Sequence, residues 1–234
     1  IHESFHALGL DFSRMNQELI NKKMKFLFPI ETDVNLYEAY TECWARIINC
    51  VFISFYTLDR KKDDEAKKEE FLITTEYCLQ FEANFSVFQM VKILQCMGLT
   101  YDFLFSSDSK MELTRKLLYK EKTNVFSYYI ITSILLSNYP FFLSWCYENN
   151  LNMIEFTKTL SNLQSFHQLI ERLYLSRKYL NYVATYEYFL SNLTNNINKI
   201  EIEPFKSQTK KQEKDDYEEK KFLYYTARMT ICEI

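Results

Sequence analysis

Residues 34–56 read VNLYEAYTECWARIINCVFISFY. Apolar side chains recur along this stretch at the spacing of one helix face, and it contains neither glycine nor proline. The pattern predicts a long helix from about Val34 to Tyr56. The whole chain of 234 residues has only 2 glycines and 3 prolines, whereas sheet-rich folds need these residues at their tight turns. We therefore expect a mainly α, multi-helix fold, and Gly9 and Gly98 are too few for a glycine-rich phosphate loop.

Further helices are expected on both sides of this stretch. Residues 1–28 are predicted to be helical with a break at 10–13, where Ser13 can cap a second helix. Residues 29–33 predict a loop, and the charged run 59–65 predicts an exposed turn. The remaining apolar periodicity predicts helices at 67–80, 84–97, 109–121, 124–138, 141–148 and 153–198.

Composition divides the chain into three segments. Residues 1–205 are expected to form one helical domain, 206–221 a charged linker or exposed loop, and 222–234 a C-terminal segment that docks on the core. The uncharged run 124–147 is interrupted by polar side chains and Pro140. It therefore favours buried helices over a membrane span, which needs about 20 apolar residues.

Charge and cysteine content limit the partners and the compartment. The net charge of −3 provides no electrostatic footprint for a nucleic acid. Six cysteines without a C-x-x-C pair predict reduced thiols, as in the cytoplasm. The abundance of Tyr, Phe, Asn, Ile and Lys is typical of AT-rich genomes, so a viral or virion-associated protein is one expectation. The sequence indicates no oligomeric state.

The sequence HESFH at residues 2–6 matches the short zinc signature H-E-x-x-H. On a helix, His2 and His6 face the same side, so both imidazoles can reach one Zn²⁺ ion. Glu3 then points toward the open coordination position and can take a proton from water there. The chain has only three histidines, and two of them belong to this motif. The alternative is an amphipathic helix with two histidines on its polar face.

Glu38 and Glu42 lie four residues apart on one face of the predicted helix 34–56 and are candidates for a third ligand. Two carboxylates on a largely apolar helix are costly to bury unless a metal or a hydrogen-bond donor receives them. The alternative is that both are surface acids, with Glu42 paired to Arg46. Gly9 fits the metzincin pattern, but Phe12 stands where that pattern needs a third histidine.

Together, residues 1 to about 50 resemble the gluzincin metallopeptidases, of which thermolysin is the familiar member. The resemblance implies a zincin-like domain in which Glu38 is the third zinc ligand and Glu42 steadies a ligand histidine; the swapped assignment of the two acids stays open. It also implies hydrolysis of a protein or peptide substrate. In that family an edge strand before the motif helix aligns the substrate. The chain begins inside the motif, so we expect an upstream sheet in a longer polypeptide.

His167 lies on an apolar stripe with a three–four spacing that runs from Met153 to Tyr174. An inward histidine on such a stripe is either a core residue or, as in many gluzincins, a donor to the oxyanion of the reaction. Tyr128 and Tyr129 are rival donors. The sequence thus favours a zinc metallopeptidase, and the alternative is a helical structural or interaction protein whose motif is fortuitous or retired from catalysis.

Overall fold

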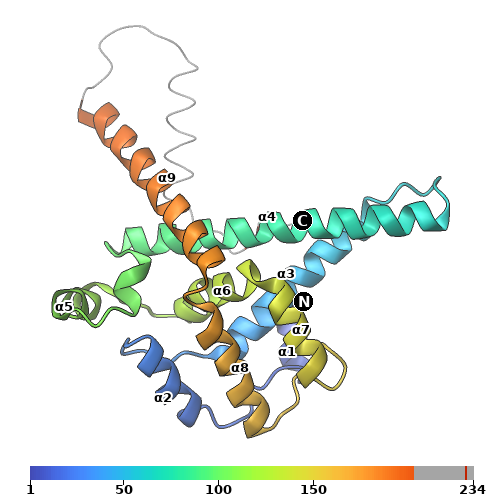
Figure 1. Ribbon diagram of the computed structural model, residues 1–234, viewed down its shortest axis with the longest axis horizontal. Helices are drawn as coiled ribbons and strands as arrows, with labels where there is room; N and C mark the ends of the chain where they lie inside the picture. Colours follow the sequence, from blue (N-terminus) through green and yellow to red (C-terminus); the bar gives the residue numbers. More distant parts are fainter. Residues whose placement is uncertain (203–229, 231–234) are drawn as a thin grey trace, which may run out of the picture.

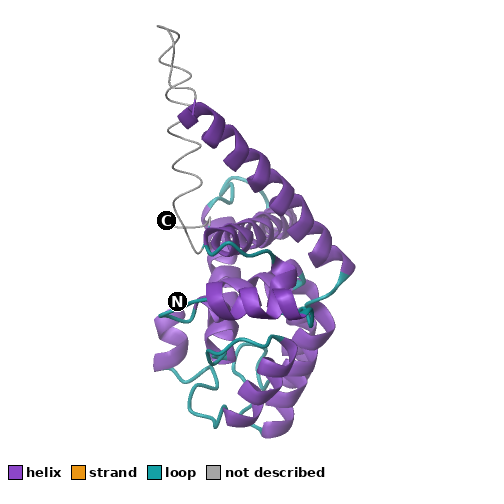
Figure 2. Ribbon diagram, turned by 90° about the vertical axis from the view of Figure 1, so that its left-hand side faces the viewer, coloured by secondary structure: helices purple, strands orange, loops and turns teal. Residues whose placement is uncertain are grey.

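The structure is a computed structural model that describes residues 1–202 and Thr230. The described residues form helices and loops without any β-strand (Figure 2). The predicted mainly α fold is therefore confirmed. Apart from Thr230, the predicted linker 206–221 and docking segment 222–234 lie outside the described residues.

The shortest of the inner helices lies at the centre of the molecule. All residues of α6 (Thr132–Ser137) are buried. It continues directly from the π-helical turn η2 (Phe126–Ile131). Around it pack α3 (Leu36–Tyr56), α4 (Asp64–Cys96), α7 (Tyr139–Asn149), α8 (Leu160–Leu173) and α9 (Arg177–Ile202). Most of residues 126–139, in the middle of the uncharged stretch, is thus buried, whereas Phe141 and Tyr147 near its end are exposed.

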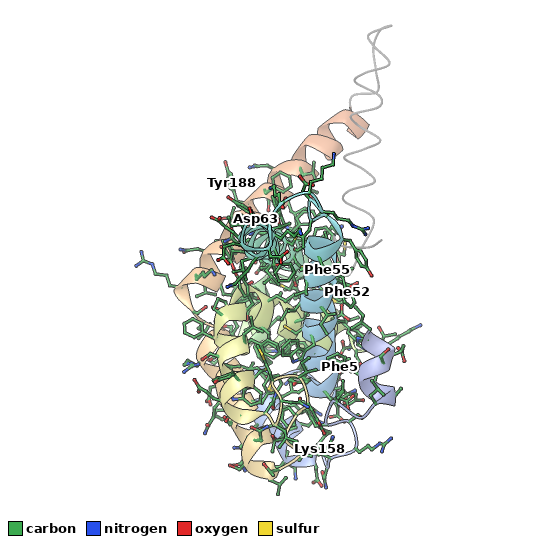
Figure 3. All side chains as sticks on the ribbon, turned by 90° about the vertical axis from the view of Figure 1, so that its right-hand side faces the viewer. Phe5, Phe52, Phe55, Asp63, Lys158 and Tyr188 are labelled. Carbon is green, nitrogen blue, oxygen red and sulfur yellow. The ribbon has the colours of Figure 1, made fainter. Side chains whose placement is uncertain are left out.

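Helices α3 and α4 pack against each other at an angle and are joined at one end by the turn at residues 57–63 (Figure 1). The predicted long helix from about Val34 to Tyr56 is therefore present. Asp63 ends the turn and begins α4, because its side chain accepts a hydrogen bond from the amide of Ala66 at 2.9 Å. Phe52 and Phe55 lie near this end of α3 (Figure 3). None of the described helices has both the length and the apolar character that a membrane crossing requires.

Two predicted helix boundaries are wrong. The helices expected at 67–80 and 84–97 are a single helix, α4, because nothing between them breaks a helix. Asn84 donates its side-chain amide to the carbonyl of Gln80, one turn back, instead of capping a new helix. The helix expected at 153–198 begins only at Leu160 and is divided into α8 and α9 by residues 174–176. It begins late because Met153 has a positive φ of 66° and Thr159 caps α8 by accepting from the amide of Asn162.

The N-terminal region is helical only in two short pieces, α1 (His2–Ala7) and α2 (Glu18–Leu27). Ser13 does not cap the second helix as predicted; its amide and hydroxyl both donate to Asp11 Oδ1. The smaller elements η1 (Tyr101–Leu104) and α5 (Ser109–Leu118) complete the described fold.

Candidate metal centre

Helix α1 is held against α3 by one apolar side chain and by its C-terminal turn. Phe5 is only 3% exposed and points from α1 into the body of the molecule (Figure 3). After the helix, the amides of Gly9 and Leu10 donate to the carbonyls of His6 and Phe5. This is a Schellman turn, and Gly9 supplies the positive φ of 65° that it needs. The turn directs the chain back, so that Asp11 lies behind His6.

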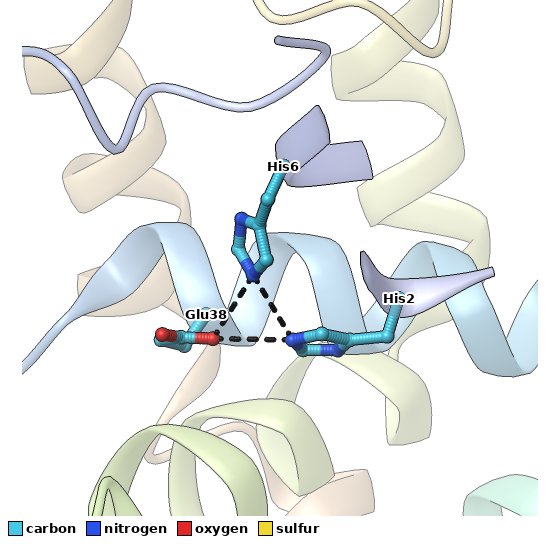
Figure 4. A group of neighbouring side chains, drawn as sticks. All are labelled: His2, His6 and Glu38. Carbon is cyan, nitrogen blue, oxygen red and sulfur yellow. Dashed lines mark hydrogen bonds and ion pairs between the residues drawn. The ribbon is translucent and has the colours of Figure 1, made fainter. Parts of the chain in front are cut away.

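Three side-chain atoms from α1 and α3 lie close together and form a triangle (Figure 4). His2 Nε2 lies 3.1 Å from His6 Nε2 and 3.2 Å from Glu38 Oε2. His6 Nε2 lies 3.4 Å from the same oxygen of Glu38. The i,i+4 spacing of the two histidines on α1 and the first turn of α3 together produce this triangle.

The opposite nitrogen of each imidazole is bonded to a carboxylate. His2 Nδ1 donates to Glu42 Oε2 at 3.0 Å, and His6 Nδ1 donates to Asp11 Oδ2. A carboxylate only accepts, so the Nδ1 atom of each ring acts as a donor here. His2 Nε2 also faces a carboxylate oxygen, Glu38 Oε2, and donates to it when His2 is protonated. With the ring proton on Nδ1, a neutral imidazole presents its Nε2 lone pair to the centre of the triangle.

Glu38 is oriented by residues near and within η2. Its Oε2 accepts from the Tyr128 hydroxyl at 2.8 Å, and its Oε1 accepts from the side-chain amide of Asn124 at 3.3 Å. Asn124 is itself fixed, because its carbonyl oxygen accepts from Asn35 at 2.9 Å. Tyr128 belongs to the π-helical turn, a rare conformation that is often found at functional sites.

The electrostatics of the triangle favour a positive charge at its centre. Burial alone lowers the pKa of His2, but hydrogen bonds to Glu38 and Glu42 outweigh it and raise this pKa to about 9. Burial alone raises the pKa of Glu38, but the hydrogen bonds from His2 and Tyr128 bring it below its ordinary value. The pKa of Glu42 is likewise lowered, by His2 and by Arg46, against the effect of burial. Burial and the bond to Glu38 raise the pKa of Tyr128.

The residues present fit a zinc ion. The donor atoms of a tetrahedral zinc site, with bonds of about 2.0–2.1 Å, lie about 3.3–3.4 Å from one another. The three distances between His2, His6 and Glu38 are 3.1, 3.2 and 3.4 Å. Two imidazoles and one carboxylate are also the donor set of many catalytic zinc sites, which keep the fourth position open. Each donor has its own partner on the far side, as ligands of metal sites usually do.

A pocket of about 440 Å³ adjoins this centre. Glu3 lines it from α1 and is exposed, and Tyr128 lines it from η2. The remaining lining residues are Ile1, His2, Glu42, Ala45, Arg46, Asn49 and Thr230. His2 is the member of the triangle that lines this pocket, together with Glu3.

The structure brings five of the predicted site residues to one place and separates the sixth from them. His2, His6 and Glu38 form the triangle, Glu42 lies behind His2, and Glu3 lines the adjoining pocket. His167 is buried on α8, which packs against α2, α6 and α7, and it lines neither the triangle nor the pocket.

Sequence reasoning missed the partners of His6 and Glu38. Asp11 is 2% exposed. The signal in the sequence is an acid between Leu10 and Phe12, five residues after the second histidine, because an acid in apolar surroundings needs a partner. Asn124 and Tyr128 are 86 and 90 residues from Glu38, so no local spacing relates them to it. Of the two tyrosines considered as donors, Tyr128 lines the pocket.

Searches against protein-family models, curated proteins and solved structures found no match for this chain. The geometry of the centre is therefore the basis for assigning it a function.

Proposed function

We propose that this protein is a zinc-dependent metallopeptidase in which His2, His6 and Glu38 bind the metal. The observation that carries this proposal is the triangle of His2 Nε2, His6 Nε2 and Glu38 Oε2, which lie 3.1–3.4 Å apart, with each side chain held by a hydrogen bond from behind. Zinc would take the place of the proton that His2 shares with Glu38 in the metal-free chain, because binding requires neutral His2. In this proposal α1 and α3 are the two ligand-bearing helices of a zincin-like domain.

The chemistry follows from the residues that line the adjoining pocket. A zinc ion held at the triangle supplies a Lewis acid, which polarises a peptide carbonyl and makes water a nucleophile at neutral pH. Glu3, between the two ligand histidines on α1, accepts the proton of the attacking water and delivers it to the leaving amine. Tyr128 stays protonated because its pKa is raised, and its single hydroxyl proton would reach the carbonyl oxygen, as negative charge develops there, only by leaving Glu38. Glu42 and Asp11 keep the two imidazoles in the orientation that presents Nε2.

The test combines metal content with hydrolysis. We expect about one zinc ion per purified chain and cleavage of a peptide library that stops when a chelator removes the zinc and resumes when zinc is added back. Zinc binding without cleavage of any peptide would instead support a helical structural or interaction protein whose centre has lost its catalytic role. A chain that binds no zinc would contradict the proposed centre itself.

A further inference from the structure

A buried cluster of charged side chains lies directly behind the candidate metal centre. Arg46 is 2% exposed and Glu82 is fully buried. Arg46 Nε donates to Glu42 Oε1 at 2.7 Å, and the other oxygen of Glu42 accepts from His2. Arg46 Nη1 faces Glu82 Oε1 at 3.5 Å. The order of contacts is therefore Glu82, Arg46, Glu42, His2, and it leads from α4 through α3 to α1.

The same guanidinium also contacts the residues that orient Glu38. Arg46 Nη2 donates to the main-chain carbonyl of Tyr128 at 3.4 Å. The hydroxyl of Tyr128 donates to Glu38 Oε2 at 2.8 Å. One side chain thus connects the group behind His2 with the group behind Glu38, although η2 and α1 are far apart in the sequence.

Burying these charged side chains is costly, so their presence needs an explanation other than stability. A buried ion pair contributes little to stability, and apolar replacements of the same shape often serve as well. An isolated metal ligand, by contrast, depends on its outer partners for orientation and affinity. A carboxylate such as Glu42 can rotate unless its second oxygen is also held, and Arg46 holds that oxygen.

We propose that Arg46, fixed in turn by Glu82, is a positioning residue that sets the zinc affinity of the centre. Arg46 orients Glu42, Glu42 orients His2, and the contact with Tyr128 aligns Glu38 at the same time. This inference rests on the proposed zinc site. Without Arg46, the chain still presents all three ligands, but two of them lose their fixed orientation.

A second buried arginine provides a matched control. Arg115 is also 2% exposed, and its bonds go to the main-chain carbonyls of Pro29, Phe103 and Ser106. It lies on α5 and contacts no residue of the metal centre. Its substitution removes a buried guanidinium and its hydrogen bonds, here to main-chain carbonyls, without touching a ligand or the partner of a ligand.

The experiment measures the zinc dissociation constant by chelator competition and the melting temperature of the zinc-free chain, for each variant at one pH. We expect Arg46→Met to weaken zinc binding about 10- to 100-fold. We expect Arg46→Lys to recover part of that loss, because it restores the charge but not the forked geometry. The isosteric Glu82→Gln should weaken binding by a smaller factor. Arg115→Met should lower the melting temperature and leave the dissociation constant within about twofold.

Several results would overturn the inference. One is an Arg46→Met chain that binds zinc within about twofold of the wild type, and another is an equal loss of affinity in Arg46→Met and Arg115→Met. If Arg46→Met does not fold, Arg46→Lys and Glu82→Gln decide, and wild-type affinity in both contradicts the proposal. A wild-type chain without zinc affinity would contradict the metal centre, and this result is distinct from a centre that binds zinc but ignores Arg46.

Discussion

At the candidate metal centre, each of the three side chains that would bind zinc is fixed in one orientation. The nitrogen or oxygen that faces away from the triangle is already bonded, to Glu42 behind His2, to Asp11 behind His6 and to Asn124 behind Glu38. The imidazoles would keep this orientation when a metal binds, because they cannot rotate without breaking these bonds. Glu3, Asp11 and His167 are expected to differ in role: Glu3 acts in the reaction, Asp11 supports a ligand, and His167 only packs.

Glu3 is expected to act in the reaction and not in metal binding. Glu3→Gln should abolish detectable peptide hydrolysis while zinc content stays at about one ion per chain, because the amide cannot accept a proton from water. Metal analysis and a peptide-cleavage assay on one preparation check this. An equal loss of zinc in the variant would mean that Glu3 is a ligand.

Asp11 is expected to support His6 from behind. Asp11→Ala removes the acceptor of His6 Nδ1 and should weaken zinc binding about 10- to 100-fold. Asp108→Ala is the control, since Asp108 only caps α5 by accepting from the amides of Lys110 and Met111. Its loss should cost about 1 kcal/mol of stability and leave zinc affinity unchanged. Chelator competition and denaturant titration distinguish the two effects, and unchanged affinity in Asp11→Ala would contradict the role assigned to Asp11.

His167 is expected to matter for stability in acid and not for the reaction. Burial lowers its pKa in the folded chain below the ordinary value of 6.5. The unfolded chain therefore binds the proton more readily, so the free energy of unfolding should fall as the pH drops below about 6.5. Unfolding curves of wild type and His167→Phe at several pH values check this, because the variant should lack that fall. A lower rate per folded molecule in His167→Phe, with unchanged stability, would restore a catalytic role.

At the scale of whole elements, α1 should depend on the proposed metal more than any other described helix does. It has only 6 residues, and helices shorter than about 12 residues are marginal on their own. Zinc would tie both of its histidines to Glu38 on α3. We expect zinc to slow hydrogen exchange of the amides of Phe5, Leu8, Gly9 and Leu10 about tenfold or more, and to leave the buried α6 unchanged. Equal slowing in α6 would indicate a global effect instead.

The elements that the sequence predicts well are those with strong local patterns. The range 34–56 and the pair His2 and His6 follow from helical spacing alone, and the structure has both on helices. The unbroken length of α4 was not predicted, because the pattern at 80–84 weakens without any residue that stops a helix. The π-helical turn that carries Tyr128 could not be predicted either, since its hydrogen-bond register depends on packing against α3 and α4.

For the molecule as a whole, the centre should couple stability to pH and to metal. The pKa of His2 is raised to about 9 in the folded chain, against an ordinary value of 6.5. Its contribution to stability is thus complete below about pH 6.5 and is lost as the pH rises toward about 9. The zinc-free wild type should show this fall in the free energy of unfolding, and His2→Gln should not.

Zinc should act in the opposite direction over the same range, since binding requires neutral His2. At a free zinc concentration of about 1,000 times the dissociation constant, the stabilisation should reach ~4 kcal/mol. Thermal unfolding with and without zinc at pH 6.5, 7.5 and 8.5 measures both effects. The same slope in the zinc-free wild type and in His2→Gln would show that another group causes the pH dependence.

Helix α3 presents Glu38, Glu42 and Arg46 at intervals of four residues, and this spacing defines a sequence pattern that can be searched for in other proteins. Successive side chains at that interval turn by only about 40° around the helix, so they form one row. A single insertion between them would rotate the rest by about 100° and destroy the row. We therefore expect a distant homologue with the same centre to keep E-x₃-E-x₃-R after H-E-x-x-H and an acid five residues beyond its second histidine. A search for that linear pattern can identify homologues whose overall sequence similarity to this chain is too low to detect.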